Sequence, residues 1–114
     1  MTRWPPRFRS AVTALRLECP SIIPVRIRRV RLAGGMYGHA RTTSTSPARI
    51  IITVATHIRD PGERERRTTV NEQRDTLMHE WAHAIAWTSN ARVDHHGPEW
   101  GLAMSRVYQA VIED

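Results

Sequence analysis

The spacing of apolar residues along this chain predicts three amphipathic helices. Apolar side chains recur every three or four residues between 7 and 19, between 69 and 89, and from Pro98 to the C-terminus, and this is the period of an α-helix. The middle segment opens with TVNE at 69–72, the pattern of a capping box in which the threonine and glutamate side chains each accept the other's backbone amide. We therefore expect the middle helix to start beside Thr69.

Three further stretches predict strands. Residues 21–32 alternate apolar residues with arginines, but the alternation slips between Arg28 and Arg29, and this slip predicts a β-bulge. A double glycine then precedes a short second strand over 35–41. The third stretch, RIIITVA at 49–55, is apolar on both faces and predicts the central strand. Short connections between the strands favour a small, largely antiparallel three-stranded sheet.

The middle helix carries HEWAH at 79–83, which is the H-E-x-x-H pattern of a zinc site. On a helix His79 and His83 lie on one face, where both imidazoles could bind a single metal ion. Glu80 follows the first histidine, so its carboxylate could take a proton from a water molecule beside that metal. The helix also has an apolar stripe on the opposite side to anchor it, formed by Leu77, Met78, Trp81 and Ile85.

A catalytic zinc ion needs a third protein ligand besides two histidines. The residues after the motif offer four candidates, namely Asp94, His95, His96 and Glu99. His96 is favoured because it directly precedes Gly97-Pro98 and so stands at a fixed entry into the last helix. The other three remain open, and the two carboxylates could instead hydrogen-bond a ligand imidazole.

The helical tryptophans are assigned to packing, and the histidines outside the two motifs to polar surface or strand positions. Trp81, Trp87 and Trp100 fall at core positions of the predicted helices. His39 and Tyr37 would line a substrate cleft if the second strand paired with an extended peptide.

Two motifs together resemble the SprT-like family of zinc metallopeptidases. That family includes bacterial SprT proteins and Spartan-type proteases that act on DNA–protein crosslinks. The motifs are HEWAHA at 79–84 and HGPEW at 96–100, and the resemblance covers about residues 20–112. Neither the Cys-rich zinc ribbon of many SprT proteins nor the long tail of Spartan-type proteins follows here, so we expect a bare catalytic module.

The resemblance implies a zincin-like α+β domain in which an N-terminal helix, the metal helix and a C-terminal helix pack with the small sheet. It implies that Zn²⁺ is bound by His79, His83 and His96, with Glu80 as the catalytic acid and base. The implied function is a zinc-dependent endopeptidase that acts on DNA-bound or DNA-crosslinked proteins. The alternative is a non-proteolytic, zinc-containing module that binds nucleic acid or protein.

The charge of the chain adds DNA as a candidate partner. All 17 positively charged residues are arginine, and residues 1–67 carry 14 of them against 4 acidic residues. Such an excess favours an anionic partner. The residues best placed along the chain to contact phosphates are Arg26, Arg28, Arg29 and Arg31.

Length and composition indicate the number of domains and the cellular location. The 114 residues suffice for one domain, 1–114, of which we expect residues 1–6 to be flexible. A single cysteine, Cys19, excludes an internal disulfide and should be a small buried residue. No apolar run is long enough to cross a membrane, and the N-terminus lacks the apolar stretch of a signal peptide. We expect a monomeric cytoplasmic protein with a protein substrate, in a bacterial cell or, if phage-encoded, in its host.

Overall fold

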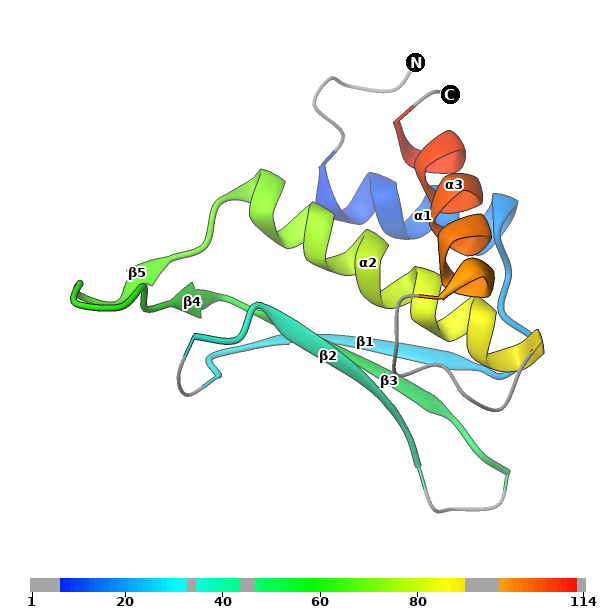
Figure 1. Cartoon of the computed structure of the whole chain (residues 1–114), viewed down its shortest axis with the longest axis horizontal. Helices are drawn as coiled ribbons and strands as arrows, with labels where there is room; N and C mark the ends of the chain where they lie inside the picture. Colours follow the sequence, from blue (N-terminus) through cyan, green and yellow to red (C-terminus); the bar gives the residue numbers. More distant parts are fainter. Residues whose placement is uncertain (1–6, 33–34, 44–46, 90–96, 113–114) are drawn as a thin grey trace.

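Three helices lie on one side of a small sheet in the computed structural model, which describes residues 7–32, 35–43, 47–89 and 97–112 (Figure 1). The architecture is α+β with a mixed sheet. The helices are α1 (Phe8–Glu18), α2 (Val70–Ser89) and α3 (Pro98–Val111). The strands are β1 (Val25–Val30), β2 (Gly38–Thr42), β3 (Ile50–Ala55), β4 (His57–Ile58) and β5 (Arg66–Arg67). Residues 1–6, which we expected to be flexible, lie outside the described residues.

All three predicted helices are present and lie close to their predicted bounds. In α1, Phe8, Ala11 and Leu15 are buried at helical spacing, as the apolar pattern predicts. Pro98 occupies the first turn of α3, where its missing N–H costs no intrahelical hydrogen bond. None of the described helices combines the length and the apolar composition of a membrane-spanning helix.

The sheet is mixed, so the prediction of a largely antiparallel sheet is wrong. Its strand order is β1-β3-β2, with β3 antiparallel to β2 and parallel to β1. The chain does reverse direction between successive strands, as short connections require, but β3 inserts between the two earlier strands. It takes the centre because residues on both of its faces are buried, with Ile50, Ile52 and Val54 on one face and Thr53 and Ala55 on the other. The predicted central strand at 49–55 is therefore confirmed.

β1 contains no bulge, because it pairs with β3 in unbroken register along its whole length. The prediction of a bulge at Arg28–Arg29 is therefore wrong. The alternation slips because Arg29 takes a position on the helix-facing side of the strand. Its guanidinium carbon lies 4.4 Å from the centroid of the Phe8 ring, and Nη1 donates to Gln73 Oε1 at 3.3 Å. The ring and the amide supply contacts that make an arginine acceptable at a site where an apolar residue was expected.

Between β3 and α2 the chain forms a short arm that the sequence pattern did not predict. In this arm β4 and β5 pair antiparallel as a second, two-stranded sheet. At its base Thr68 is buried, and its hydroxyl donates to the Ala55 carbonyl at 2.8 Å and accepts from the Gln73 side chain at 2.9 Å. This buried polar contact fixes the first turns of α2 to the end of β3.

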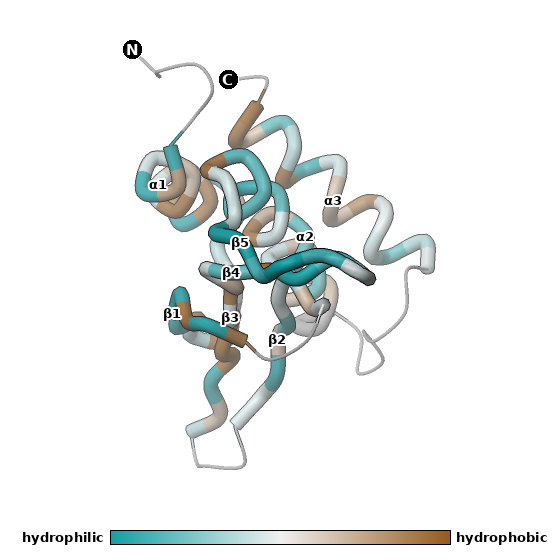
Figure 2. The backbone as a smooth tube through the Cα atoms, turned by 90° about the vertical axis from the view of Figure 1, so that its left-hand side faces the viewer, coloured by the Kyte–Doolittle hydropathy of each residue, from teal (hydrophilic) through white to brown (hydrophobic). Residues whose placement is uncertain are grey.

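The core lies between the sheet and the helices, and α2 is its central element. Viewed along the sheet, α2 lies between α1 and α3 (Figure 2). The predicted anchoring stripe is buried as expected. Ala82, Ala84 and Ala86 are buried as well, so α2 is enclosed on more faces than a single stripe predicts. The reason is that α2 packs against both other helices in addition to the sheet.

Trp81 anchors α2 to the end of α1. Its side chain is 1% exposed, and Nε1 donates to the backbone carbonyl of Cys19 at 2.8 Å. Cys19 is itself buried, as predicted. A buried indole needs such an acceptor for its N–H, so this contact sets the rotation of α2 about its own axis.

We expect Gly38→Ala to destabilise the fold, because α2 and the sheet approach each other closely at Gly38. A Cβ atom there would collide with the Thr53 carbonyl oxygen and would lie 2.6 Å from Thr76 Cγ2. Overpacking of this kind should lower the free energy of unfolding by about 2 kcal/mol, measured by urea denaturation. Gly101→Ala is the matched control, because a Cβ atom meets nothing within 4 Å there. Because Gly101→Ala replaces a glycine inside a helix, it should raise the free energy of unfolding by roughly 0.5–1 kcal/mol.

Candidate metal centre

The start of α2 is fixed by the capping box that the sequence predicted. The backbone N–H of Glu72 donates to Thr69 Oγ1 at 3.1 Å, and the backbone N–H of Thr69 donates to Glu72 Oε1 at 2.8 Å. Arg66 donates two further hydrogen bonds to the Glu72 carboxylate, each of 2.8 Å. The hydrogen bonds from Arg66, followed by the one from Thr69, lower the pKa of Glu72 to about 2. The helix that carries the histidines therefore begins at a defined residue.

The imidazoles of His79 and His83 meet on one side of α2. Their Nε2 atoms lie 3.2 Å apart, and the ring centroids are separated by 4.9 Å. Two nitrogens bound to one tetrahedral zinc ion, each at about 2.0–2.1 Å, lie roughly 3.3–3.4 Å apart. The separation of the two Nε2 atoms thus fits a shared metal ion of this size.

Glu80 points a carboxylate into a buried position beside these histidines. The residue is 9% exposed, and the described residues include no hydrogen-bond donor or ion-pair partner for its carboxylate. Burial raises the pKa of Glu80 to about 7, because desolvation disfavours the charged form. A nearby metal ion would favour the carboxylate again. A carboxyl group whose pKa lies near neutrality is suited to accepting and releasing a proton.

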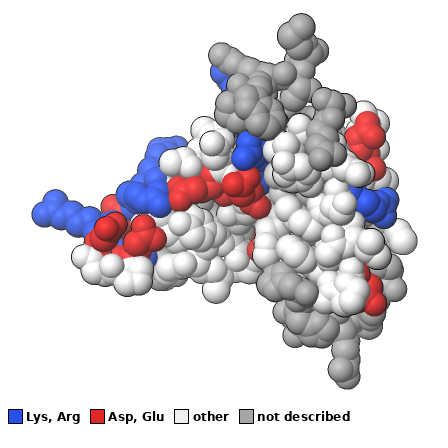
Figure 3. All heavy atoms as spheres, turned by 45° about the horizontal axis from the view of Figure 1, so that its top comes forward, with Lys and Arg blue, Asp and Glu red and all other residues white. Residues whose placement is uncertain are grey.

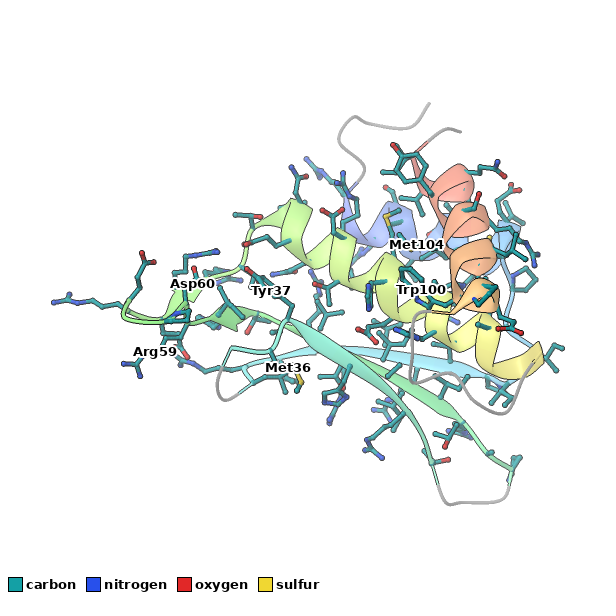
Figure 4. The ribbon with its side chains drawn as sticks, viewed as in Figure 1. Met36, Tyr37, Arg59, Asp60, Trp100 and Met104 are labelled. Atoms are coloured by element: carbon teal, nitrogen blue, oxygen red, sulfur yellow. The ribbon has the colours of Figure 1, made fainter. Side chains whose placement is uncertain are left out.

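A cleft of about 450 Å³ opens beside Glu80 and His79. Its wall combines the first residue of β2, and the residue before it, with one face of α2. The lining residues are Tyr37, Gly38, Glu72, Asp75, Thr76, His79 and Glu80. Figure 4 shows Tyr37 between the sheet and the first turns of α2, where its hydroxyl donates to Glu72 Oε2 at 3.2 Å. Of the two residues expected to line a substrate cleft, Tyr37 lines this cleft and His39 does not.

Sequence reasoning missed Asp75 and Thr76 as residues of this cleft. Both lie one turn before His79 on α2, so the helical period that pairs the two histidines would have placed them on the same face. Glu72 was predicted for its capping role alone, and it also lines the cleft. The spacing within α2 does not indicate a cleft, because the cleft forms only where the start of β2 approaches this face of the helix.

Trp100 covers the two imidazoles from α3. Its ring centroid lies 5.1 Å from that of His79 and 5.6 Å from that of His83, and Nε1 donates to the His79 carbonyl at 3.4 Å. Figure 4 shows the residue at the start of α3, facing α2. We expected Trp100 to be a core anchor, but it is half-buried. It brings the start of α3 against the pair of histidines.

The third predicted ligand, His96, lies outside the described residues, as do Asp94 and His95. Glu99 is exposed in the first turn of α3. Among the described residues no three His, Cys, Asp or Glu side chains are grouped closely enough to hold a metal ion. The described part of the site therefore consists of two histidines and one buried glutamate.

The four arginines expected to contact phosphates do not form one surface. Arg28 Nε donates to Thr53 Oγ1 at 2.9 Å, Arg29 lies over Phe8 on the helix-facing side, and Arg31 is paired with Glu65. Figure 3 shows charged side chains of both signs crowded around the β4–β5 arm, where acidic residues partly offset the arginines. The positive charge is thus less concentrated there than the sequence suggests.

Comparison with known proteins gives a match to one protein family. No curated protein and no solved structure gives a significant match. A family model described as SprT-like family matches residues 25–113, from the start of β1 to beyond the end of α3. The match spans most of the chain and includes α2 with its two histidines and glutamate. The protein is a member of the SprT-like family.

Proposed function

We propose that the protein is a zinc-dependent endopeptidase, with His79, His83 and His96 as the zinc ligands and Glu80 as the general acid and base. The observation that carries the proposal is the pair of Nε2 atoms 3.2 Å apart on the helix that also holds the buried Glu80. Membership of the SprT-like family supports it, because that family is associated with metallopeptidase-type function.

When bound, zinc would supply a Lewis acid that lowers the pKa of water and polarises a carbonyl group. The chain's own contribution to the chemistry is Glu80. Its carboxylate would accept a proton from the attacking water and deliver it to the nitrogen of the leaving amine. Burial keeps this carboxylate away from competing hydrogen-bond partners among the described residues, so it remains available for the transfer.

The cleft beside Glu80 supplies a place for an extended substrate. β2 is an edge strand of the sheet, and the cleft begins at its first residue, Gly38. An edge strand offers unpaired backbone groups to which an extended peptide can add as a further strand. A substrate held in this way would pass in front of His79 and Glu80, and Tyr37 would border its path.

The assignment of His96 as the third ligand rests on the position of Trp100. This tryptophan packs against both imidazoles, so the start of α3 lies beside the pair. His96 precedes Trp100 by four residues, and we expect so short a segment to allow its imidazole to reach the histidine pair. Glu99 is also close to Trp100 in sequence. Among the described residues, however, it does not form a three-residue cluster with the two histidines.

The experiment that tests the proposal measures zinc content and cleavage of an unfolded, fluorescently quenched protein. We expect the purified chain to retain zinc, to lose cleavage when zinc is chelated, and to regain cleavage when zinc is returned. His96→Ala should weaken zinc binding at least about ten-fold and abolish cleavage. His95→Ala is the matched control and should keep both properties.

Each outcome of this experiment has a defined meaning. Zinc loss in His95→Ala with retention in His96→Ala would move the third ligand to His95. If both variants retain zinc, the third ligand is Asp94 or Glu99. A wild-type chain that carries zinc and cleaves nothing would favour the non-proteolytic module, and a chain that binds no zinc would overturn the proposal.

A further inference from the structure

A second groove, which we call the β1 groove, lies between α1 and β1. It borders the β1 edge of the sheet, whereas the histidine cleft borders the β2 edge. Its volume is about 740 Å³, and Figure 2 shows α1 and β1 one above the other on this side. Its apolar floor is formed by Phe8, Val12, Val25 and Ile27. Five arginines surround that floor, namely Arg9, Arg16, Arg26, Arg29 and Arg49. Among the described residues that line it there is no acidic side chain.

The arginines of the β1 groove are exposed and are not neutralised by the described part of the chain. All five are exposed. The ion pairs among the described residues involve other arginines, which are Arg31, Arg66 and Arg74. Several like charges around one groove repel each other, and an anionic ligand would relieve this repulsion.

The groove also exposes a strand edge. Pro24 and Val30 both accept hydrogen bonds from the β3 side, from Ile50 and Thr56. Because backbone groups alternate in direction along a strand, residues 25, 27 and 29 turn theirs away from β3, toward the open edge. Arg16 of α1 already donates to one of these carbonyls, that of Val25, at 3.1 Å. The backbone groups of Ile27 and Arg29 have no such partner among the described residues.

We propose that the β1 groove binds an extended acidic peptide, which adds to the open edge of β1 as a further strand. The free backbone groups of Ile27 and Arg29 would pair with its backbone. Side chains of an extended peptide alternate between two faces. Side chains of the peptide that face the helices would be apolar and would pack on the floor. Those on the other face would be carboxylates that meet guanidinium groups on that face, such as that of Arg26, because guanidinium groups bind carboxylates in a fork geometry. The partner class is therefore a segment in which acidic and apolar residues alternate.

The observations favour a peptide over a nucleic acid as the occupant. Single-stranded nucleic acid binds through phosphate contacts combined with bases stacked on aromatic side chains. Among the described residues, Phe8 is the one aromatic residue that lines the β1 groove. It is 9% exposed, and the guanidinium of Arg29 covers its ring. The described residues of the groove thus offer no free stacking surface, whereas they do offer a strand edge that a nucleic acid cannot pair with.

The test measures binding of a fluorescent peptide of about seven residues, the length of an ordinary strand, in which glutamate alternates with valine. Fluorescence anisotropy is recorded with the full chain carrying Glu80→Gln, so that cleavage of the probe does not interfere. We expect saturable binding that weakens roughly ten-fold or more when Arg26 and Arg49 are both replaced by glutamate. The matched control replaces Arg59 and Arg64 of the arm by glutamate, and it should bind as the parent does.

Two altered probes test the strand pairing without any change to the protein. A peptide with lysine in place of glutamate should not bind, and a peptide with methyl groups on alternate backbone nitrogens should bind roughly ten-fold more weakly. The proposal would be overturned if the methylated peptide bound as tightly as the unmethylated one. It would also be overturned if the arm variant weakened binding as much as the Arg26 and Arg49 variant does. Tighter binding of oligothymidylate than of the acidic peptide, lost in the Arg26 and Arg49 variant, would assign the groove to nucleic acid instead. These outcomes do not depend on whether the chain is a peptidase.

Discussion

Glu80→Gln should abolish peptide-bond cleavage and leave zinc binding unchanged. Glutamine has nearly the shape of glutamate, so the packing of this buried position is kept, but its amide cannot accept and return a proton in the same way. Loss of a general acid and base typically lowers the rate by 10²–10⁴-fold, and we expect an effect on the order of 10³ on kcat/KM. The measurement is cleavage of an unfolded protein at saturating zinc, together with the zinc content of the variant.

Glu99→Gln provides the matched control for this prediction. It makes the same chemical change at an exposed glutamate in the first turn of α3, and it should retain both zinc and activity. Cleavage by Glu80→Gln at the wild-type rate would rule out the proposed role of Glu80. Loss of zinc in Glu99→Gln would instead identify Glu99 as the third ligand.

Trp81→Ala should have the largest effect on stability, lowering the free energy of unfolding by roughly 3–5 kcal/mol. The indole is 1% exposed and occupies the contact between α2 and the end of α1. Its removal would leave a large cavity and would deprive the Cys19 carbonyl of its donor. Domains of this size have only about 5–15 kcal/mol of stability in total. Thermal and urea denaturation measure the change.

Two further variants separate the parts of this effect. Trp81→Phe keeps an aromatic ring but removes the hydrogen bond to Cys19, so it should cost less than Trp81→Ala. Leu102→Ala removes an exposed apolar side chain from α3, 71% exposed, and should change stability by no more than about 0.5 kcal/mol. Similar losses for Leu102→Ala and Trp81→Ala would show that Trp81 does not anchor the helix.

The helices and the central strand could be predicted because their signals are local. The capping box at Thr69 and Glu72 and the apolar stripe around Trp81 are each encoded within a few turns of one helix. The same holds for the pairing of His79 with His83, which the helical period places on one face. The apolar run at 49–55 predicted burial on both faces, and β3 has it.

The strand order and the cleft could not be predicted because they depend on contacts between distant segments. The parallel pairing of β1 with β3 is decided by which strand is buried most completely, and short connections say nothing about it. Arg29 broke the alternation of β1 because Phe8 and Gln73, from two helices, supply its contacts. Likewise the cleft exists because Gly38 allows β2 to approach α2 closely, and neither segment alone indicates this approach.

The central position of β3 also has a consequence for the order in which the chain folds. β2 and β3 are neighbours in sequence, so their antiparallel pairing closes a short loop, whereas the parallel pairing of β1 with β3 must enclose the whole of β2. Loop closure costs more entropy as the loop grows, and parallel pairs of distant strands form late. β3, most of whose side chains are apolar, should therefore spend part of folding with the backbone groups of one edge unpaired. During that interval the nascent chain is most exposed to aggregation, and the arrival of β1 ends it.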